Sequence, residues 1–334
     1  MFFSVVIPVY NKEKEIRSTL ETVLVQSFID FEVVLVDDGS SDGSMEIVKG
    51  IKDSRIRLFS QKNQGVSAAR NAGIRQAVGQ YIALLDADDR WEPSYLKEQY
   101  DLIQKYPQCG VFAVNYSYVY SSGAKVPNRV NHLDFCGMDG ILKDYFRVAA
   151  FSQPPVCSSA VVIRKDCLES VGGFPVGITS GEDLITWARL AYRYEIAYSK
   201  KCLAWYILRE ELELTSTPTR FFDGDYVEQQ LIALLRKDAG YMYKSSLRKY
   251  IGLWFKMKSS VYFRADRKRE CWKYGMKSLR YNPACIGQYA ILLLAVLPLG
   301  VRNMAKRYVQ SVKTKKQSIM TQVLKRVFYY IIIV

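Results

Sequence analysis

The chain has 334 residues, of which 49% are hydrophobic and 24% are charged; this composition is typical of a folded protein and excludes an intrinsically disordered one. Its single histidine, His132, argues against catalytic triads, zinc sites with several histidine ligands and histidine proton relays. The net charge of +14 is unevenly distributed, because residues 1–240 carry 27 Lys+Arg against 31 Asp+Glu, whereas residues 241–334 carry 20 against 2.

The first 90 residues alternate short apolar runs with segments of helical periodicity. The β-branched run at 4–9 predicts a strand, and apolar residues at helical spacing predict a helix over 12–28 with Asn11 as its N-cap. The alternation continues with strands at 31–36, 55–60 and 81–85 and with helices at 45–51 and 65–77. This order predicts βαβ units and a parallel sheet, whose ligands bind outside the carboxyl ends of the strands.

Carboxylates follow two of these strands at that edge. Asp37 and Asp38 follow the second strand, and Asp86, Asp88 and Asp89 follow the fourth. Residues two apart at a strand end share a face, and a pair of carboxylates without Cys or His favours a hard cation, Mg²⁺ or Mn²⁺. The alternative is a polar turn in which Asp89 caps a helix that begins near residue 91.

Downstream, the pattern predicts a helix at 93–106, a long strand at 110–120, a loop-rich stretch at 121–156 and a strand at 160–164. A short helix at 165–171 and a helix at 184–194 follow. Glu182 and Asp183 precede the last helix, where acidic side chains are favoured by its N-terminus alone.

Five segments in this order resemble the family 2 glycosyltransferases, which are inverting, nucleotide-sugar-dependent enzymes of the GT-A fold. They are Ser4–Asn11, Val33–Asp42, Asn63–Gly73, Tyr81–Asp89 and Gly181–Leu184, the last followed by Trp187 and Arg189. The resemblance implies a GT-A domain, with a Rossmann-like, mostly parallel central sheet flanked by helices. A mostly helical basic extension follows it.

The resemblance also implies roles for residues that bind the donor. Pro8, Val9 and Tyr10 would lie along the nucleotide base, and Asp37 would accept a hydrogen bond from it, with the N3–H of uracil as the expected donor. Arg70 would reach phosphate or hold the carboxylates, since a guanidinium suits both. Each of these positions also has a structural explanation, in strand packing, a turn or a helix surface.

The remaining implied roles concern the reaction. Asp88 would bind the divalent cation, and Asp86 would bind the cation or the donor ribose. The cation would stabilise the leaving diphosphate. Asp183 would be the general base that takes the acceptor proton, and Glu182 would orient the acceptor or the base.

These roles predict transfer of a single sugar from a nucleotide-sugar, most simply a UDP-sugar, to a saccharide or lipid-linked acceptor in cell-surface polysaccharide or glycolipid synthesis. The Gln-x-x-Arg-Trp segment of the family's processive synthases is not found in the sequence. Two alternatives remain open: a catalytically silent nucleotide-sugar-binding module, and a nucleotidyltransferase. The latter usually has a Gly-rich loop near its N-terminus, and residues 8–11 do not form one.

We therefore expect a GT-A catalytic domain over residues 1–240, divided into a nucleotide-sugar-binding half (1–110) and an acceptor half (111–240), and a basic, apolar helical region at 241–334. Residues 284–301 carry no charge, and residues 302–326 carry eight basic residues and no acidic one. A single span would place this charge on the far side of the membrane, against the positive-inside tendency. Residues 284–334 are instead expected to contact the membrane surface. Nucleic-acid binding and a solvated appendage are the alternatives.

The seven cysteines form no C-x-x-C pair and favour reduced thiols. The N-terminus does not resemble a secretory signal peptide. Together these features predict a cytoplasmic protein. The long apolar runs beside the basic residues favour lipid over nucleic acid, so we expect it to be peripheral or monotopic on the cytoplasmic face of the membrane and expect no nucleic acid as a partner.

Overall fold

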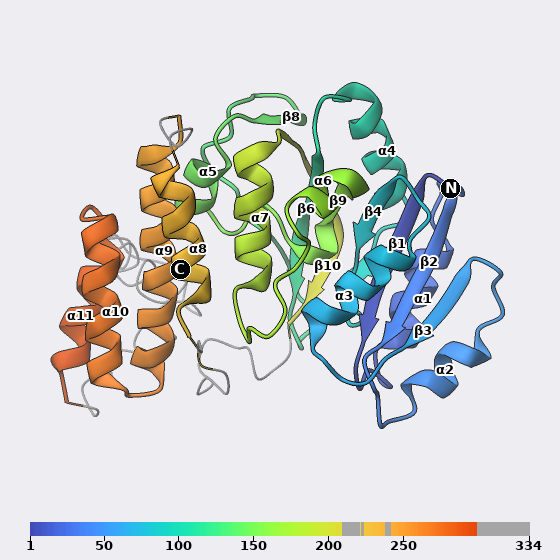
Figure 1. Cartoon of the computed structure of the whole chain (residues 1–334), viewed down its shortest axis with the longest axis horizontal. Coiled ribbons are helices and arrows are strands. Elements are labelled where there is room, and N and C mark those ends of the chain that lie inside the picture. The colour runs from blue at the N-terminus through green and yellow to red at the C-terminus, as the bar shows by residue number, and fades with distance from the viewer. Residues whose placement is uncertain (209–220, 222–223, 238–241, 299–334) are drawn as a thin grey trace. The chain divides into compact units, whose positions relative to one another are not determined.

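The computed structural model describes residues 1–208, 221, 224–237 and 242–298 (Figure 1). The chain divides by its internal contacts into two compact units, Met1–Glu210 and Glu211–Val334. Helix α8 (Tyr226–Arg236) packs against the helices that follow it, so it belongs to the second unit. The separate catalytic domain expected over residues 1–240, with its halves 1–110 and 111–240, stays a prediction.

The first unit contains one sheet and the helices that pack on it. Its elements are β1 (Phe3–Val9), α1 (Ile16–Leu24), β2 (Phe31–Asp37), α2 (Ser44–Gly50), β3 (Ile56–Ser60), α3 (Val66–Gln76), β4 (Tyr81–Leu84), β5 (Arg90–Trp91), α4 (Tyr95–Lys105), β6 (Val111–Val119), β7 (Lys125–Pro127), β8 (Asp139–Leu142), α5 (Tyr145–Phe151), the 3-10 turn η1 (Ser158–Ala160), β9 (Val161–Arg164), α6 (Lys165–Ser170), α7 (Glu182–Arg193) and β10 (Ile196–Ile207).

The ten described strands form a single sheet in the order β3-β2-β1-β4-β9-β6-β10-β5, with β7 beside β6 and β8 beside β10. Neighbours among β3, β2, β1 and β4 pair in parallel, whereas β9 is antiparallel to both β4 and β6. Helices α3, α6 and α7 lie on the face of the sheet that is turned toward the viewer in Figure 1. The predicted α/β class, with a central sheet flanked by helices, is confirmed.

The inner parallel strands β1, β2 and β4 are mostly apolar, and both of their faces are covered. Every residue of β2 is buried, and Val5, Ile7, Val33 and Leu35 are almost fully excluded from solvent in one continuous core. Such continuous apolar runs are typical of strands between two helical layers. The tightly packed strands consequently hold the polar residues at their ends in fixed positions.

Helix α3 lies unusually close to β1. A Cβ atom placed on Gly73 would be 2.4 Å from Cγ1 of Val6 and 3.3 Å from Cγ2 of Val36. Real Cβ atoms do not approach that closely in packed interiors, so a glycine is required where the helix crosses the sheet. The close approach fixes the position of Arg70, one turn earlier on the same helix.

Several local predictions need correction. The first helix begins at Ile16, and Asn11 does not cap it: Asn11 has a left-handed φ of 51°, and its side chain accepts a hydrogen bond from the Ser41 backbone. Strand β10 was not predicted, although it is 12 residues long. The stretch 121–156, expected to be loop-rich, also contains β7, β8 and α5.

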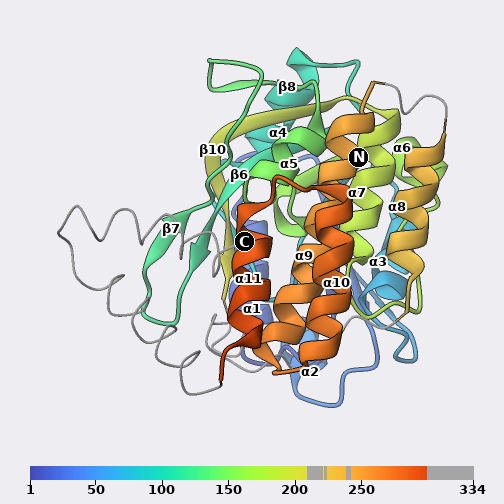
Figure 2. The ribbon, with the colours of Figure 1, turned by 90° about the vertical axis from the view of Figure 1, so that its left-hand side faces the viewer.

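The second unit is helical and contains α8, α9 (Lys244–Arg264), α10 (Lys268–Tyr281) and α11 (Ile286–Val296). Helices α9, α10 and α11 run side by side (Figures 1 and 2). Within the described part of the chain, no helix combines the length and the hydropathy needed to cross a membrane. The basic stretch at 302–326 and the apolar end at 327–334 lie outside the described residues.

Candidate functional site

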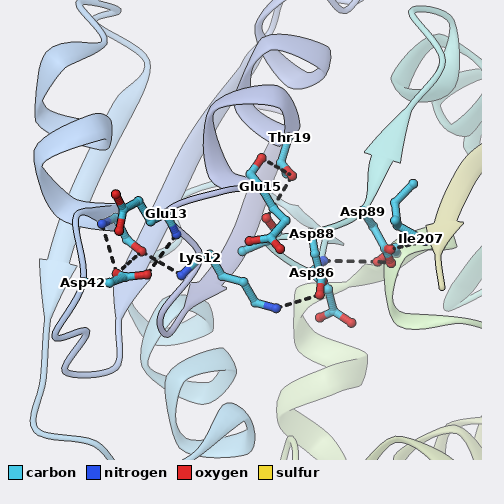
Figure 3. A network of polar contacts seen from close by, with 12 residues as sticks. Lys12, Glu13, Glu15, Thr19, Asp42, Asp86, Asp88, Asp89 and Ile207 are labelled. Carbon is cyan, nitrogen blue, oxygen red and sulfur yellow. Dashed lines mark hydrogen bonds and ion pairs between the residues drawn. The ribbon is translucent and has the colours of Figure 1, made fainter. Parts of the chain in front are cut away.

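The loops that follow β1 and β2 are joined by hydrogen bonds at the carboxyl edge of the sheet (Figure 3). The backbone N–H of Lys12 donates to Oγ of Ser44 at 2.7 Å, and that of Glu13 donates to Oδ2 of Asp42 at 3.0 Å. Glu13 in turn accepts from the Gly43 N–H at 3.2 Å. These bonds hold the loop after β1 in a fixed position against the Asp37–Gly43 loop and the first residue of α2.

The two carboxylates after β2 have different surroundings. Oδ1 of Asp37 accepts the Ser40 N–H at 2.8 Å, which closes the turn after the strand. Asp38 is buried and accepts the backbone N–H groups of Gln64 and Gly65 at 2.9 and 2.8 Å. Asp38 thus anchors the entry to α3, whereas Asp37 lies at the strand end where a base contact was predicted.

Of the residues predicted to lie along the base, only Tyr10 presents a large surface. Its side chain is 49% exposed, whereas the side chain of Val9 is completely buried in the core. The Val9 carbonyl accepts the Asp38 N–H at 2.8 Å, and Pro8 is half-buried. A ring at the position of Tyr10 can stack on a planar group, but Val9 can contribute only through its backbone.

Asp89, the third acid after β4, has a structural role. Its carboxylate accepts the Ser159 hydroxyl at 2.5 Å and the Ile207 N–H at 2.9 Å, and it is almost completely buried. Burial, followed by the charges of Asp86 and Asp88, raises the pKa of Asp89 well above its ordinary value. The alternative that it caps a helix near residue 91 is wrong, because the next helix begins at Tyr95.

Asp88 is paired with a lysine from the loop after β1. Its Oδ2 lies 2.6 Å from Nζ of Lys12. Figure 3 draws this contact as a dashed line. Burial, and then the neighbouring Asp86, raise the pKa of Asp88 to about 6. Burial and the charge of Asp88 also raise the pKa of Glu15, which is drawn beside it in Figure 3. The site therefore concentrates negative charge that a cation stabilises.

Arg70 connects the acids after β4 to the start of α7. Its Nη2 donates to Oδ1 of Asp86 at 2.6 Å, and its Nη1 lies 3.6 Å from Oε1 of Glu182. The guanidinium also lies over the Phe174 ring, 5.1 Å from its centroid. Arg70 is buried, yet its Nε and Nη1 make no hydrogen bond with any described residue. Nε thus remains for an oxygen-rich ligand, whereas Nη1 lies at ion-pair distance from Glu182.

Helix α7 begins with the two acids that were predicted to act on the acceptor. Oδ1 of Asp183 accepts the Leu184 N–H at 2.6 Å. Burial, and then the charge of Asp183, raise the pKa of Glu182 to about 7, while burial also raises the pKa of Asp183. Carboxyl groups whose pKa values are raised toward neutrality are suited to proton transfer.

Asn71 lies in the Asn63–Gly73 segment, next to Arg70, and its side chain holds the loop before α7. Its Nδ2 donates to the Phe174 carbonyl at 2.7 Å, and its Oδ1 accepts the Phe174 N–H at 2.9 Å. The preceding Gly173 has a left-handed φ of 62°, and a Cβ there would be 2.6 Å from Oδ1 of Asn71. Asn71 therefore holds the loop that leads to α7 against α3.

The structure brings together most of the residues predicted for the reaction. Asp86, Arg70 and Glu182 are linked directly, and Asp88 and Asp183 neighbour them in sequence. Sequence reasoning missed Lys12, Asn71 and Ser159. Asn71 lies next to Arg70 in the Asn63–Gly73 segment, so the sequence does signal it as a site residue. The Lys12–Asp88 contact has no such signal, because it depends on the tertiary fold.

The oxygen ligands at this edge fit a hard divalent cation. Among the described residues, no group of three or more His, Cys, Asp or Glu side chains converges in a way that could hold a metal alone. Asp86 and Asp88 offer two carboxylates, and Mg²⁺ typically binds through one or two carboxylates, with water and substrate phosphate as its other ligands. The donor set therefore fits an ion that is shared with a phosphorylated substrate.

A helix-flanked α/β sheet with acidic residues after its parallel strands is the arrangement expected of a GT-A-type protein. The sequence profile of "Glycosyl transferase family 2" matches residues 4–172. The chain belongs to this family.

Two curated relatives illustrate the similarity. An uncharacterized glycosyltransferase of Rickettsia felis is 31% identical over 200 residues, which are 58% of this chain and 31% of the relative. The putative teichuronic acid biosynthesis glycosyltransferase TuaG of Bacillus subtilis is 30% identical over 210 residues, 61% of this chain and 78% of TuaG. The chain spans about a third of the length of the Rickettsia relatives it matches.

Two solved structures share the fold at low identity. S. aureus TarS 1–349 in complex with UDP-GlcNAc has a TM-score of 0.56 at 18% identity, covering 84% of this chain and 89% of that one. Mannosyltransferase PcManGT from Pyrobaculum calidifontis, in complex with GDP-Man and Mn²⁺, has a TM-score of 0.57 at 17% identity, covering 99% and 84%.

Proposed function

We propose that the protein transfers a single sugar from a nucleotide-sugar, most simply a UDP-sugar, to a hydroxyl group of a saccharide or lipid-linked acceptor, with inversion at the anomeric carbon. The observation that carries the proposal is the link through Arg70 between Asp86 after β4 and Glu182 at the start of α7. It joins the segment that would bind the donor to the segment that would act on the acceptor.

The donor nucleotide would bind over the ends of β1 and β2. Tyr10 offers an exposed ring for stacking on the base, with Pro8 and the Val9 backbone beside it, and Asp37 offers a carboxylate to a base N–H. A carboxylate at this position favours uracil, whose N3–H is a donor. The UDP-GlcNAc bound by TarS and the GDP-Man bound by PcManGT support a nucleotide-sugar as the donor class.

The leaving diphosphate would be stabilised by positive charge. Asp88 and Asp86 would hold a divalent cation, which supplies electrostatic stabilisation of the charge developing on the leaving group. The Mn²⁺ in the PcManGT complex supports this choice of cofactor. Arg70 would direct its Nε donor toward donor oxygens, and Lys12 would keep the Asp88 carboxylate in place.

The acceptor would be activated by the acids of α7. Asp183 would take the proton from the acceptor hydroxyl while the acceptor oxygen forms a bond to C1 and the bond between C1 and the phosphate oxygen breaks. Glu182, fixed by Arg70, would orient Asp183 or the acceptor. One displacement from the face opposite to the leaving group inverts the configuration at C1.

The similarity to TuaG supports an acceptor in cell-surface polysaccharide synthesis. Glycolipid synthesis, with a lipid-linked acceptor, would place the enzyme in the cytoplasm, peripheral or monotopic at the membrane surface. The excess of positive charge in residues 241–334 supports such a membrane partner.

The test of this proposal is a donor panel. UDP-, GDP-, ADP- and TDP-sugars are incubated with the full chain in the presence of Mn²⁺, Mg²⁺ or EDTA, and release of nucleoside diphosphate is measured. We expect slow, metal-dependent release from one class of donor, and NMR of the product formed with a matching acceptor should show an inverted anomeric configuration. Absence of nucleotide binding under every condition would overturn the proposal.

A further inference from the structure

Helix α11 presents an apolar face to solvent. Over its eleven residues it carries no charged side chain, and Ile286, Leu293 and Val296 are 75%, 67% and 57% exposed. With Tyr289 they recur every three or four residues, so they lie along one side of the helix. Large contiguous exposed apolar surfaces on folded proteins usually mark a binding site.

The neighbouring helix α10 continues this surface with basic and aromatic side chains. Trp272 and Met276 are exposed, and together with Tyr289 and Leu293 they line a groove between α10 and α11 that Arg280 also borders. Arg269, Lys273 and Arg280 are exposed along α10. No ion pair in the described part of the chain involves any of these three cations.

We propose that this α10–α11 surface, formed by Arg269, Trp272, Lys273, Met276, Arg280, Ile286, Tyr289, Leu293 and Val296, docks on a membrane of anionic phospholipid. Aliphatic side chains would enter the acyl boundary, the aromatic rings would lie at the headgroup level, and the basic side chains would contact lipid phosphates. This inference is independent of the proposed reaction.

Charge and shape favour lipid over other occupants. A second copy of the chain that docked through the same face would bring two sets of the cations Arg269, Lys273 and Arg280 together. None of the nine residues that form the surface is acidic, so the contact is repulsive. The chain's own residues 302–326 carry eight basic residues and no acidic one, so this stretch does not complement the cations of the surface either. Single-stranded nucleic acid would suit the cations and aromatic rings, but it would leave the exposed aliphatic side chains of α11 without partners.

The test is co-sedimentation of the full chain with vesicles of phosphatidylcholine alone and of equal parts phosphatidylcholine and phosphatidylglycerol. We expect binding to the anionic vesicles only. Leu293→Glu, and separately the triple variant Arg269→Glu/Lys273→Glu/Arg280→Glu, should each weaken binding at least about tenfold. The matched control is Lys49→Glu/Arg75→Glu/Lys143→Glu, which makes the same change in net charge on exposed side chains of the first unit. It should reduce binding much less than the α10–α11 triple variant.

Circular dichroism of each variant tests whether it is folded. We expect all of them to fold, because the substituted side chains are exposed. Unchanged vesicle binding by folded Leu293→Glu and by the triple variant would overturn the proposal and assign any lipid binding to other residues. So would failure of the wild-type chain to bind anionic vesicles. The proposal would also be overturned if vesicle binding persisted in both variants while another interaction was lost. That interaction could be a concentration-dependent dimer or the binding of single-stranded RNA.

Discussion

At the scale of single residues, the site depends on charges that are buried together. Arg70 contacts Asp86 and Glu182, and Lys12 contacts Asp88, so both acids predicted to bind the metal have a cation within ion-pair distance. Removal of one partner from a buried ion pair leaves an uncompensated charge, which costs more than the loss of a surface pair. Variants at Arg70, Lys12, Asp86 and Asp88 should consequently have large effects. Glu182 differs, because the cost of burying its charge exceeds the gain from its longer, 3.6 Å contact with Arg70.

Arg70→Lys tests the guanidinium itself. A lysine keeps the positive charge but provides a single point of contact, so it cannot contact Asp86 and Glu182 in the same way. We expect the rate of sugar transfer to fall at least about tenfold. Arg75→Lys, an exposed position on the same helix, is the control and should retain wild-type activity. Wild-type rates in Arg70→Lys would show that a simple positive charge is sufficient.

Glu182→Gln tests the raised pKa of Glu182, which is about 7 in the folded protein and near 4.5 when unfolded. Between these values the folded state holds more protons than the unfolded state, so the ionisation destabilises the fold as pH rises through this window. Glutamine resembles the neutral form, and we expect it to raise the free energy of unfolding near pH 8 by about 1–3 kcal/mol. The difference in free energy of unfolding between the variant and the wild type should decrease as the pH is lowered toward about 4.5.

Denaturant titration at several pH values measures this difference directly. The same variant should lose transferase activity, because the glutamine would no longer be held by Arg70 as a carboxylate that orients Asp183 or the acceptor. A stability difference that does not vary with pH would show that Glu182 has an ordinary pKa.

At the scale of secondary-structure elements, α3 organises the site. It passes close to β1 through Gly73, it carries Arg70 toward the carboxylates, and through Asn71 it holds the loop before α7. Arg70, Asn71 and Gly73 lie within one turn of this helix. The helix can therefore position segments that are 103 residues apart in sequence, such as Asn71 and Phe174.

Gly73→Ala tests the close approach of α3 to the sheet. The new methyl group would collide with the side chain of Val6 in a fully packed core, and we expect a loss of about 1–3 kcal/mol in the free energy of unfolding. Gly50→Ala is the control, since no heavy atom lies within 4 Å of a Cβ at that position. Equal stability of the two variants would contradict the packing described here.

Asn71→Ala tests the connection between α3 and the loop before α7. Both hydrogen bonds to Phe174 would be lost, so the acids of α7 would be less well positioned while the nucleotide site stayed intact. We expect an about tenfold lower rate with an unchanged dissociation constant for the nucleotide. Gln76→Ala, exposed on the same helix, should have no effect. A weaker nucleotide affinity with an unchanged rate would assign Asn71 to donor binding instead.

At the scale of the whole molecule, much of the α/β architecture could be predicted, because buried parallel strands read as continuous apolar runs and end in recognisable turns. Strand β10 escaped prediction because residues such as Lys200, Lys201 and Cys202 interrupt its apolar pattern where its pairing with β6 is irregular. The acids of the site were found from motifs. Their pairing with Lys12 and Arg70 was harder to anticipate, since it depends on contacts made only after the strands are assembled.

Charge is also segregated at this scale, because the acids that would bind the donor and the exposed cations of α10 belong to different units of the chain. Donor chemistry and membrane docking are therefore separable, and a variant of the α10–α11 surface can be tested without altering a residue of the catalytic site.

The central claim is that a metal-dependent nucleotide-sugar site forms around Asp88 and Asp86. The measurement that tests it most directly is the rate of nucleoside diphosphate release from the preferred donor by the wild-type chain and by Asp88→Ala, with Mn²⁺ and with EDTA. The account predicts release that requires the metal and that falls at least about a hundredfold in a folded Asp88→Ala variant. Release at the wild-type rate by folded Asp88→Ala, or undiminished release in EDTA, would contradict it.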